Sequence, residues 1–178
     1  MAYLFQSERL GFRSWRVDDV AKMAAINADP AVMEFFPKTK TRKQTAAFIE
    51  QVKSEFSTKG FCYFAIDKLD NGEFIGFIGL SEQRFEADFT PCIEIGWRLA
   101  RKEWGRGYAT EGAARCLEYA FDELNLRKVV AMTPEINLRS EKVMKKIGME
   151  QVKRFRHPLL KNEPRLANCV LYEAVAKN

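Results

Sequence analysis

The sequence lacks the features of membrane-bound and disulfide-stabilised proteins. No apolar stretch approaches the roughly 20 residues that a membrane-spanning helix needs. Residues 1–9 contain no apolar segment of signal-peptide length. The four cysteines lie far apart among apolar neighbours and form no Cys-x-x-Cys pair, so we expect buried free thiols in a reducing compartment. These absences predict a cytoplasmic protein with no membrane partner, and we expect no bound metal.

A concentrated block of basic charge is also absent. The net charge is +5 and the sequence pI is about 9.0, but the basic residues are interleaved with acids. This pattern indicates a solvated mixed surface and gives no strong nucleic-acid signal, although a modest positive field would help to attract an anionic cofactor. The 178 residues contain no repeat, low-complexity tract or Gly/Ser linker. We therefore expect one domain over residues 1–178.

Periodicity and turn signals predict an α+β domain built on one mixed, mostly antiparallel sheet. Thr41-x-x-Gln44 fits a capping box at a helix start, Asp70-Asn71-Gly72 indicates a hairpin turn, and Gly148 is in a C-cap position. Hairpin signals precede a βαβ pattern, so the sheet should contain a parallel crossover. We expect strands at 10–13, 61–67, 73–80, 92–100, 128–133, 150–156 and 166–175, and helices at 20–27, 42–59, 108–125 and 140–147.

Residues 93–113 carry the main chemical signal. An expected strand runs into a loop with Gly105 and Gly107, and this loop opens the helix predicted at 108–125. The first N–H groups of a helix have no intrahelical partner, and glycines let the backbone approach a bulky anion. Arg101, Lys102 and Arg106 add positive charge. The segment therefore predicts a phosphate or pyrophosphate site.

Two known phosphate-binding loops fit this segment poorly. A Walker loop ends in Gly-Lys-Ser/Thr, which is absent. The dinucleotide fingerprint needs a third small residue where this chain has Thr110, and its strand should begin a parallel series rather than end a meander. On these residues alone, a purely structural glycine turn stays open.

Several motifs in order and spacing together resemble the GNAT superfamily of acetyl-coenzyme A-dependent N-acetyltransferases, with the RimJ/RimL ribosomal-protein N-terminal acetyltransferases as the most similar branch. The resemblance covers nearly the whole chain. It implies a GNAT-like acyl-CoA N-acyltransferase fold, with helices flanking a sheet that is splayed at the cofactor site. The motifs are Ser7-Glu8-Arg9-Leu10-x-Phe12-Arg13-x-Trp15, Asp29-Pro30-x-Val32-Met33, Glu94-Ile95-Gly96-Trp97, Trp104-Gly105-x-Gly107-Tyr108-Ala109-Thr110-Glu111 and Asn137-x-x-Ser140-x-x-Val143-Met144-x-Lys146-x-Gly148-Met149.

The resemblance also implies where acetyl-CoA would bind. The pantetheine arm would pair with the backbone around Trp97 and Leu99, and the pyrophosphate would lie on N–H groups of residues 102–109. Asn137 would bond the pantetheine or orient the reacting end. Lys102 departs from the wider superfamily's Gln/Arg, with a mild expected effect because backbone donors hold the phosphate. The implied cofactor-binding residues are Trp97, Arg98, Leu99, Lys102, Trp104, Gly105, Arg106, Gly107, Tyr108, Ala109, Thr110 and Asn137.

Glu94 is the candidate general base. Strand alternation places Glu94, Gly96 and Arg98 on one face, in the middle of an otherwise apolar strand. Burial would raise the pKa of this glutamate toward a value useful for accepting an amine proton. The alternative is a simple ion pair between Glu94 and Arg98. The backbone N–H of Trp97 is the expected donor to the oxyanion.

The general acid is less defined by the sequence. Many relatives carry a tyrosine seven residues after the asparagine, but this chain has Met144 there. Ser140 is the candidate substitute, with a simple helix N-cap as its alternative. Tyr108 could reach the site but more simply packs. No Ser-His-Asp set is visible, and the single histidine, His157, is interpreted as an ordinary loop residue.

Three interpretations of the function are left open. The chain acetylates a protein N-terminal amine, or it acetylates a small amine such as an amino acid, polyamine or amino sugar. In the third, it is a non-catalytic module that binds CoA, RNA or the ribosome. The resemblance allows a homodimer. Glu82, Glu86 and Asp88 could attract a cationic acceptor, or could form only a solvated acidic loop. Three variable loops are candidate acceptor walls: residues 32–41, 81–91 and 155–164.

Overall fold

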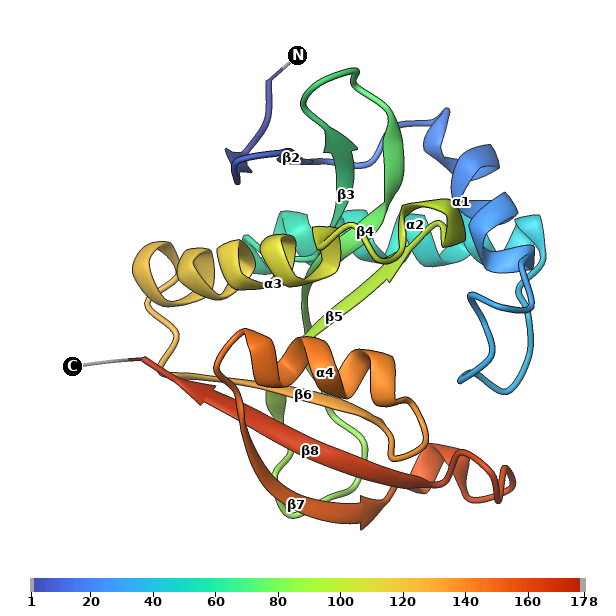
Figure 1. Ribbon diagram of the computed structural model, residues 1–178, viewed down its shortest axis with the longest axis vertical. Helices are drawn as coiled ribbons and strands as arrows, with labels where there is room; N and C mark the ends of the chain where they lie inside the picture. Colours follow the sequence, from blue (N-terminus) through green and yellow to red (C-terminus); the bar gives the residue numbers. More distant parts are fainter. Residues whose placement is uncertain (1, 177–178) are drawn as a thin grey trace.

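One mixed sheet organises the chain. The computed structural model describes residues 2–176, and its sheet has eight strands in the order β1-β2-β3-β4-β5-β6-β8-β7 (Figure 1). The pair β5 and β6 is parallel, and the other neighbouring strands are antiparallel, as the α+β prediction requires. The strands are β1 Phe5–Gln6, β2 Leu10–Arg13, β3 Tyr63–Lys68, β4 Phe74–Gln83, β5 Cys92–Leu99, β6 Lys128–Pro134, β7 Glu150–Arg156 and β8 Asn168–Val175.

Helices cover both faces of the sheet. In Figure 1, α3 and α4 lie in front of it, and α2 lies behind. Within the described residues, no helix is both long and apolar enough to cross a membrane. The α-helices are α1 Asp19–Ala28, α2 Arg42–Lys59, α3 Tyr108–Glu118 and α4 Leu138–Lys146.

Local signals in the sequence set several boundaries correctly. The Thr41 hydroxyl accepts the N–H of Gln44, and the Gln44 side chain accepts the N–H of Thr41, which completes the capping box at the start of α2. Gly60 ends α2 in the left-handed conformation with φ of 76°. Residues 69–72 form the turn between β3 and β4. These features are confirmed because each one depends only on residues close in sequence.

Three elements differ from the predictions. The two-residue strand β1 was not expected, since it is too short to show a period. The helix predicted at 108–125 is α-helical only to Glu118, and Tyr119–Glu123 forms a π turn. Helix α4 begins at Leu138 rather than Ser140, because Asn137 caps it. The remaining strand and helix boundaries fall within a few residues of their expected positions.

The core has one apolar layer on each face of β4. On one face, a Cβ built at Gly112 of α3 would lie 2.3 Å from Ile78, so glycine lets this helix approach the sheet closely. On the other face, Phe77 contacts the rings of Trp15 and of Phe48 on α2. The two layers fix which β5 side chains face α2 and which face α3. Because Phe77 is the register partner of Arg98 and Ile78 that of Trp97, Arg98 faces α2 and Trp97 faces α3.

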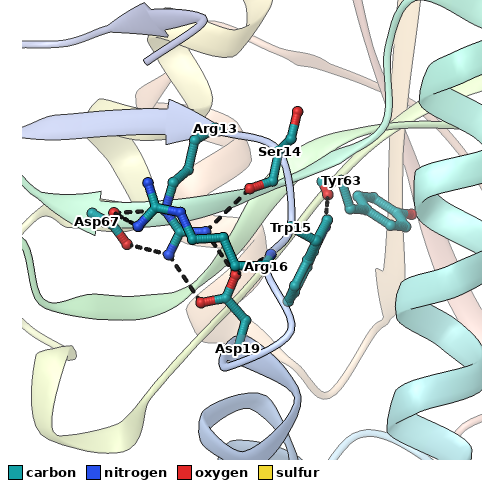
Figure 2. Close-up of polar contacts among 7 residues, drawn as sticks. All are labelled: Arg13, Ser14, Trp15, Arg16, Asp19, Tyr63 and Asp67. Carbon is teal, nitrogen blue, oxygen red and sulfur yellow. Dashed lines mark hydrogen bonds and ion pairs between the residues drawn. The ribbon is translucent and has the colours of Figure 1, made fainter. Parts of the chain in front are cut away.

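A buried ion cluster ties the start of the chain to β3 (Figure 2). Arg13 lies 2.6 Å from carboxylate oxygens of both Asp19 and Asp67, and all three side chains are buried. Burial alone would lower the pKa of Arg13, but hydrogen bonds to the two carboxylates raise it overall. The indole N–H of Trp15 donates to the carbonyl of Tyr63 at 2.6 Å. These contacts hold β2, β3 and the start of α1 together.

Candidate active site

A cavity of about 820 Å³ opens where β5 leaves β6. The two strands pair at one register position, Glu94 with Val130, whereas β5 pairs with β4 along its whole length. The expected splay of the sheet is therefore present. The cavity wall comes from β5, the end of β6, the loop before α3, helix α4, and the loops at 32–37 and 157–160.

The loop before α3 presents unpaired backbone donors to this cavity. Gly105 and Gly107 both have positive φ, 76° and 84°, which favours glycine at these positions. No side chain caps the N-terminus of α3, which begins at Tyr108. The first helical N–H groups and the helix dipole therefore remain available to an anion. Gly105, Gly107, Tyr108, Ala109 and Thr110 all line the cavity.

The beginning of the chain holds this loop in place. Glu111 accepts hydrogen bonds from the Ser7 hydroxyl at 2.6 Å, the Arg9 backbone N–H at 2.8 Å and Arg9 Nε at 2.6 Å. Burial would raise the pKa of Glu111, but these hydrogen bonds lower it overall. Arg9 also donates to the carbonyl of Arg106 and lies 4.7 Å from the Tyr108 ring centre. Sequence reasoning missed this link, although Ser7 and Arg9 belong to the first resemblance motif.

Two of the expected cofactor residues do not line the cavity with their side chains. The Lys102 side chain pairs with Glu73. Arg106 is exposed and lies 3.8 Å from Glu103. Trp104 does line the cavity; its indole N–H donates to the carbonyl of Leu99 at 3.0 Å. A contribution of Lys102 to anion binding would therefore come from its backbone N–H.

Glu94 lines the cavity on the face of β5 that Arg98 shares. Burial raises the pKa of Glu94 to about 8, although a backbone hydrogen bond from Met132 on β6 acts in the opposite direction. The alternative ion pair with Arg98 is not formed among the described residues, because Arg98 donates to Asn27 Oδ1 at 2.7 Å instead. Glu94 is thus a carboxyl with a backbone hydrogen bond but with no ion-pair partner among the described residues, at the point where the sheet splays.

Tyr63 is a cavity residue that sequence reasoning missed. It is aligned across the sheet with Gly79 and Gly96, and a Cβ built at Gly96 would lie 3.1 Å from the Tyr63 ring. The ring therefore covers Gly96, between Glu94 and Arg98. Burial raises the pKa of Tyr63 well above its usual value, and the nearby Glu94 raises it further, so the phenol stays protonated. Gly79 and Gly96 leave room for Tyr63, but their alignment with Tyr63 can be recognised only once the strand register is known.

Asn137 organises a polar patch on the opposite wall. Its Oδ1 accepts the N–H of Ser140 at 3.3 Å, which makes Asn137 the N-cap of α4. Its Nδ2 donates to Thr133 Oγ1 at 2.9 Å and to Ser140 Oγ at 3.1 Å. The interpretation of Ser140 as a simple N-cap is therefore wrong. Met144 is buried in the same wall, so no side-chain hydroxyl stands at that position.

Sequence and structure comparisons agree with this geometry. Residues 9–150 match the family model described as an acetyltransferase (GNAT) domain. The chain belongs to the GNAT family. It is 34% identical over 139 residues to the uncharacterized protein YkkB of Bacillus subtilis, which covers 78% of this chain and 80% of that one. It is 31% identical over 146 residues to the uncharacterized N-acetyltransferase YnaD of the same organism, covering 82% and 81%. The crystal structure of a GNAT-family acetyltransferase from Bacillus anthracis superposes with a TM-score of 0.80, 25% identity and 96% coverage of both chains.

The protein is therefore an N-acetyltransferase with a GNAT fold, and the family uses acetyl-CoA. The residues present fit that molecule. The loop at 105–110 offers backbone donors for the pyrophosphate, and the gap between β5 and β6 leaves strand edges free for an extended arm. The cavity continues from this gap to Glu94.

His157 contributes to the cavity of this GNAT protein as a neutral ring. It lines the wall, and burial lowers its pKa. Its Nδ1 accepts the N–H of Leu159 at 3.2 Å, and its ring lies 4.4 Å from that of Phe85. These contacts hold the loop of residues 157–160 in position, which agrees with the interpretation of His157 as a loop residue.

Two of the three candidate acceptor loops form walls of the cavity. No residue of 81–91 lines it, so the expectation for that loop is wrong. Two of its three acids are engaged elsewhere: Glu82 pairs with Lys59 at 2.6 Å, and Asp88 pairs with Lys153, while Glu86 is exposed. These pairs partly neutralise the loop, which packs behind the cavity wall through the contact of Phe85 with His157. The lining residues from the other two loops are Val32, Phe35, Phe36, Pro37, His157, Leu159 and Leu160.

Proposed function

We propose that this enzyme transfers the acetyl group of acetyl-CoA directly to a primary amine, with Glu94 as the general base. The acceptor ammonium must lose a proton before its nitrogen can attack. Glu94 takes this proton, either directly or through one water molecule, and the second amine proton leaves to solvent when the tetrahedral intermediate collapses to the amide. The thioester supplies the acetyl group and a thiol leaving group. No residue forms a covalent acyl bond in this scheme.

The observation that carries the proposal is the Glu94 carboxyl, which has no ion-pair partner among the described residues, beside the gap between β5 and β6. A pKa of about 8 leaves this group partly ionised near neutral pH and basic enough to accept a proton. Glu94 faces α2, where the cavity continues, while the backbone of the same strand faces the gap. The acceptor and the thioester can therefore meet at this strand. The backbone N–H of Trp97 is the proposed donor to the charge that develops on the acetyl oxygen.

Ser140 is the proposed proton donor to the leaving thiolate. Its hydroxyl accepts a hydrogen bond from Asn137 Nδ2 and lines the cavity on the side opposite Glu94. Because Asn137 donates to the Ser140 oxygen, the hydroxyl proton is free to point into the cavity. Proton removal by Glu94 and proton donation by Ser140 then take place at different walls of the cavity. Solvent returns both groups to their starting states.

The acceptor belongs to one of two classes, a protein N-terminal amine or a small amine. The fold is shared with a ribosomal-protein-S5-alanine acetyltransferase from Vibrio fischeri at 17% identity and a TM-score of 0.78. The fold is also shared with a spermidine N-acetyltransferase from Vibrio cholerae, at the same 17% identity and a TM-score of 0.73. These likenesses concern the fold alone, so the acceptor must be chosen from the side chains of the cavity.

A thiol-release assay with acetyl-CoA and a panel of amines tests the proposal. The panel contains peptides, amino acids, amino sugars and polyamines. We expect turnover with at least one class, and we expect Glu94→Gln to lower kcat/KM by about 100-fold or more. Ser140→Ala should lower kcat with little change in the dissociation constant of acetyl-CoA. Glu50→Gln is the matched control, because Glu50 is exposed and pairs only with Lys53. Binding of acetyl-CoA without turnover on any amine would indicate a non-catalytic module instead.

A further inference from the structure

Arg98 is a partly buried cation on the wall of the cavity that faces α2, and it has no carboxylate partner among the described residues. Its guanidinium lies 4.2 Å from the ring centre of Phe36 and 5.3 Å from that of Phe77. Nη1 donates to Asn27 Oδ1, while Nε is buried and has no hydrogen-bond partner. None of the ion pairs formed by residues 2–176 involves Arg98.

The surrounding residues hold this guanidinium in a fixed position. Asn27 is fully buried, and its Nδ2 donates to Thr45 Oγ1 at 3.0 Å, so its Oδ1 must face Arg98. Phe36 lies over the guanidinium from the loop between α1 and α2. Burial lowers the pKa of Arg98 only to about 10, which leaves it charged at neutral pH. A buried charge with an unused donor is costly unless a partner supplies the opposite charge.

The distance from Glu94 limits what that partner can be. Arg98 lies four residues along the same strand face, which is about 13 Å between Cα atoms before the side chains lean toward each other. The neutral Tyr63 ring lies between them. A short molecule could therefore place an amine near Glu94 and an anionic oxygen near Arg98. A polyamine would place a second positive charge against the guanidinium, which is unfavourable.

We infer that the acceptor is a small primary amine that also carries an anionic oxyacid group, a carboxylate or a phosphate, and that Arg98 binds this group. The inference rests on the proposed function and narrows it. The planar guanidinium suits both groups because it can donate two parallel hydrogen bonds to their oxygens. Arg98 thus acts as a specificity residue through its side chain, in addition to the expected role of its backbone near the pantetheine arm.

Paired acceptors that differ only in the anionic group test the inference. Free glycine is compared with glycinamide, and O-phosphoethanolamine with ethanolamine. Spermidine and short peptides with acidic or neutral first residues complete the panel. Rates are expressed per unprotonated amine, because the anionic group changes the pKa of the amine itself. A charge-assisted hydrogen bond should favour the anionic member of at least one pair by about 10- to 100-fold in kcat/KM. The pair that shows the preference identifies carboxylate or phosphate.

Two variants at Arg98 separate binding of the anion from a purely structural role. Arg98→Gln should bring the ratio within a pair to about one, while Arg98→Lys should keep part of the preference because it keeps the charge. The ratio is internal to each variant, so a general loss of activity does not affect it. Thermal unfolding and calorimetry with acetyl-CoA verify that each variant is folded and holds the cofactor.

Binding is measured in parallel so that the inference does not depend on turnover. The same pairs are titrated into wild-type protein saturated with CoA, and the anionic member should bind more tightly in the same proportion. Equal binding and equal kcat/KM within both pairs would overturn the inference, as would a preference for spermidine or for peptides with neutral first residues. Absence of turnover with every amine, together with tighter binding of an anionic member, would refute the proposed function and the acceptor role but support Arg98 as the residue that binds the anionic group.

Discussion

The Glu94 carboxyl should make the stability of the protein depend on pH in a predictable direction. Burial raises its pKa from 4.5 to about 8, so the folded protein keeps this proton over a range in which the unfolded chain has lost it. Because the folded state then binds more protons than the unfolded state, this group lowers the free energy of unfolding as pH rises from about 4.5 to about 8. Glutamine has nearly the same shape as glutamate and cannot ionise. The Glu94→Gln variant should therefore not show this fall in the free energy of unfolding.

The size of the effect follows from the pKa shift. A difference of roughly 3.5 pKa units, at about 1.4 kcal/mol each, corresponds to about 5 kcal/mol. This is an upper bound, since Glu94 is only partly buried and water can enter the cavity. We therefore expect the free energy of unfolding of Glu94→Gln, relative to that of wild type, to increase by about 2 to 4 kcal/mol between low and high pH.

Urea unfolding of both proteins, near pH 5 and near pH 9, measures this gain. All other titrating groups are shared, so they cancel in the difference between the two proteins. The Glu50→Gln control should give a difference that does not change with pH, because Glu50 is 71% exposed. If the difference between wild type and Glu94→Gln also stayed constant to within about 0.5 kcal/mol, the assigned pKa shift would be wrong.

The same shift predicts the kinetic profile. Expressed per total amine, over a pH range in which the acceptor is mostly ammonium, wild-type kcat/KM should rise about tenfold per pH unit below about 8 and level off above it, because only the carboxylate accepts the ammonium proton. Glu94→Gln should lose this slope as well as activity. A flat wild-type profile would remove Glu94 as the base even if the stability difference were found.

Three further substitutions test other parts of the structure. Gly107→Ala places a Cβ at a φ of 84° and 3.3 Å from Arg9 Nη2, so the dissociation constant of acetyl-CoA should rise about tenfold in calorimetry; unchanged affinity would refute the role of this turn. Glu111→Gln weakens three hydrogen bonds, so we expect about 1 to 2 kcal/mol of lost stability together with weaker acetyl-CoA binding, whereas a stability loss alone would show that the loop does not need this anchor. Asp67→Asn leaves Arg13 with one buried carboxylate, and urea unfolding should show a loss of about 3 to 5 kcal/mol with unchanged kcat/KM in the folded protein. A loss under about 1 kcal/mol would contradict the cluster's structural role.

The features that the sequence predicted well depend on nearby residues. The capping box at Thr41, the hairpin turn at Asp70-Asn71-Gly72 and the loop at Gly105 and Gly107 each place their partners within a few positions. Their physics is local, so one sequence is enough to find them. The alternation that placed Glu94 on the face of Arg98 is equally local, and the structure agrees with it.

The features that the sequence did not predict depend on contacts between distant segments. Glu111 meets Ser7 across 104 positions, and Arg13 meets Asp67 across 54. Charges at such separations give no periodic signal, and their pairing is fixed only once the strands are in register. The same reason explains the error at residues 81–91, where Glu82 and Asp88 look available in sequence but pair with lysines from α2 and β7.

In the proposed reaction, strand β5 separates the two substrates, because its backbone and its side chains face different spaces. Its backbone faces the gap left by β6, which suits the extended arm of acetyl-CoA, while the side chains of Glu94 and Arg98 face α2, where the proposed acceptor would lie. Changes to those two side chains can therefore alter acceptor binding or proton transfer without changing the edge that the cofactor uses. Phe36 and Tyr63 border the same space from the α1–α2 loop and from β3. Acceptor choice in this protein should thus vary through four side chains, whereas we expect affinity for acetyl-CoA to depend on backbone geometry at Gly105 and Gly107 and on the splay at Val130.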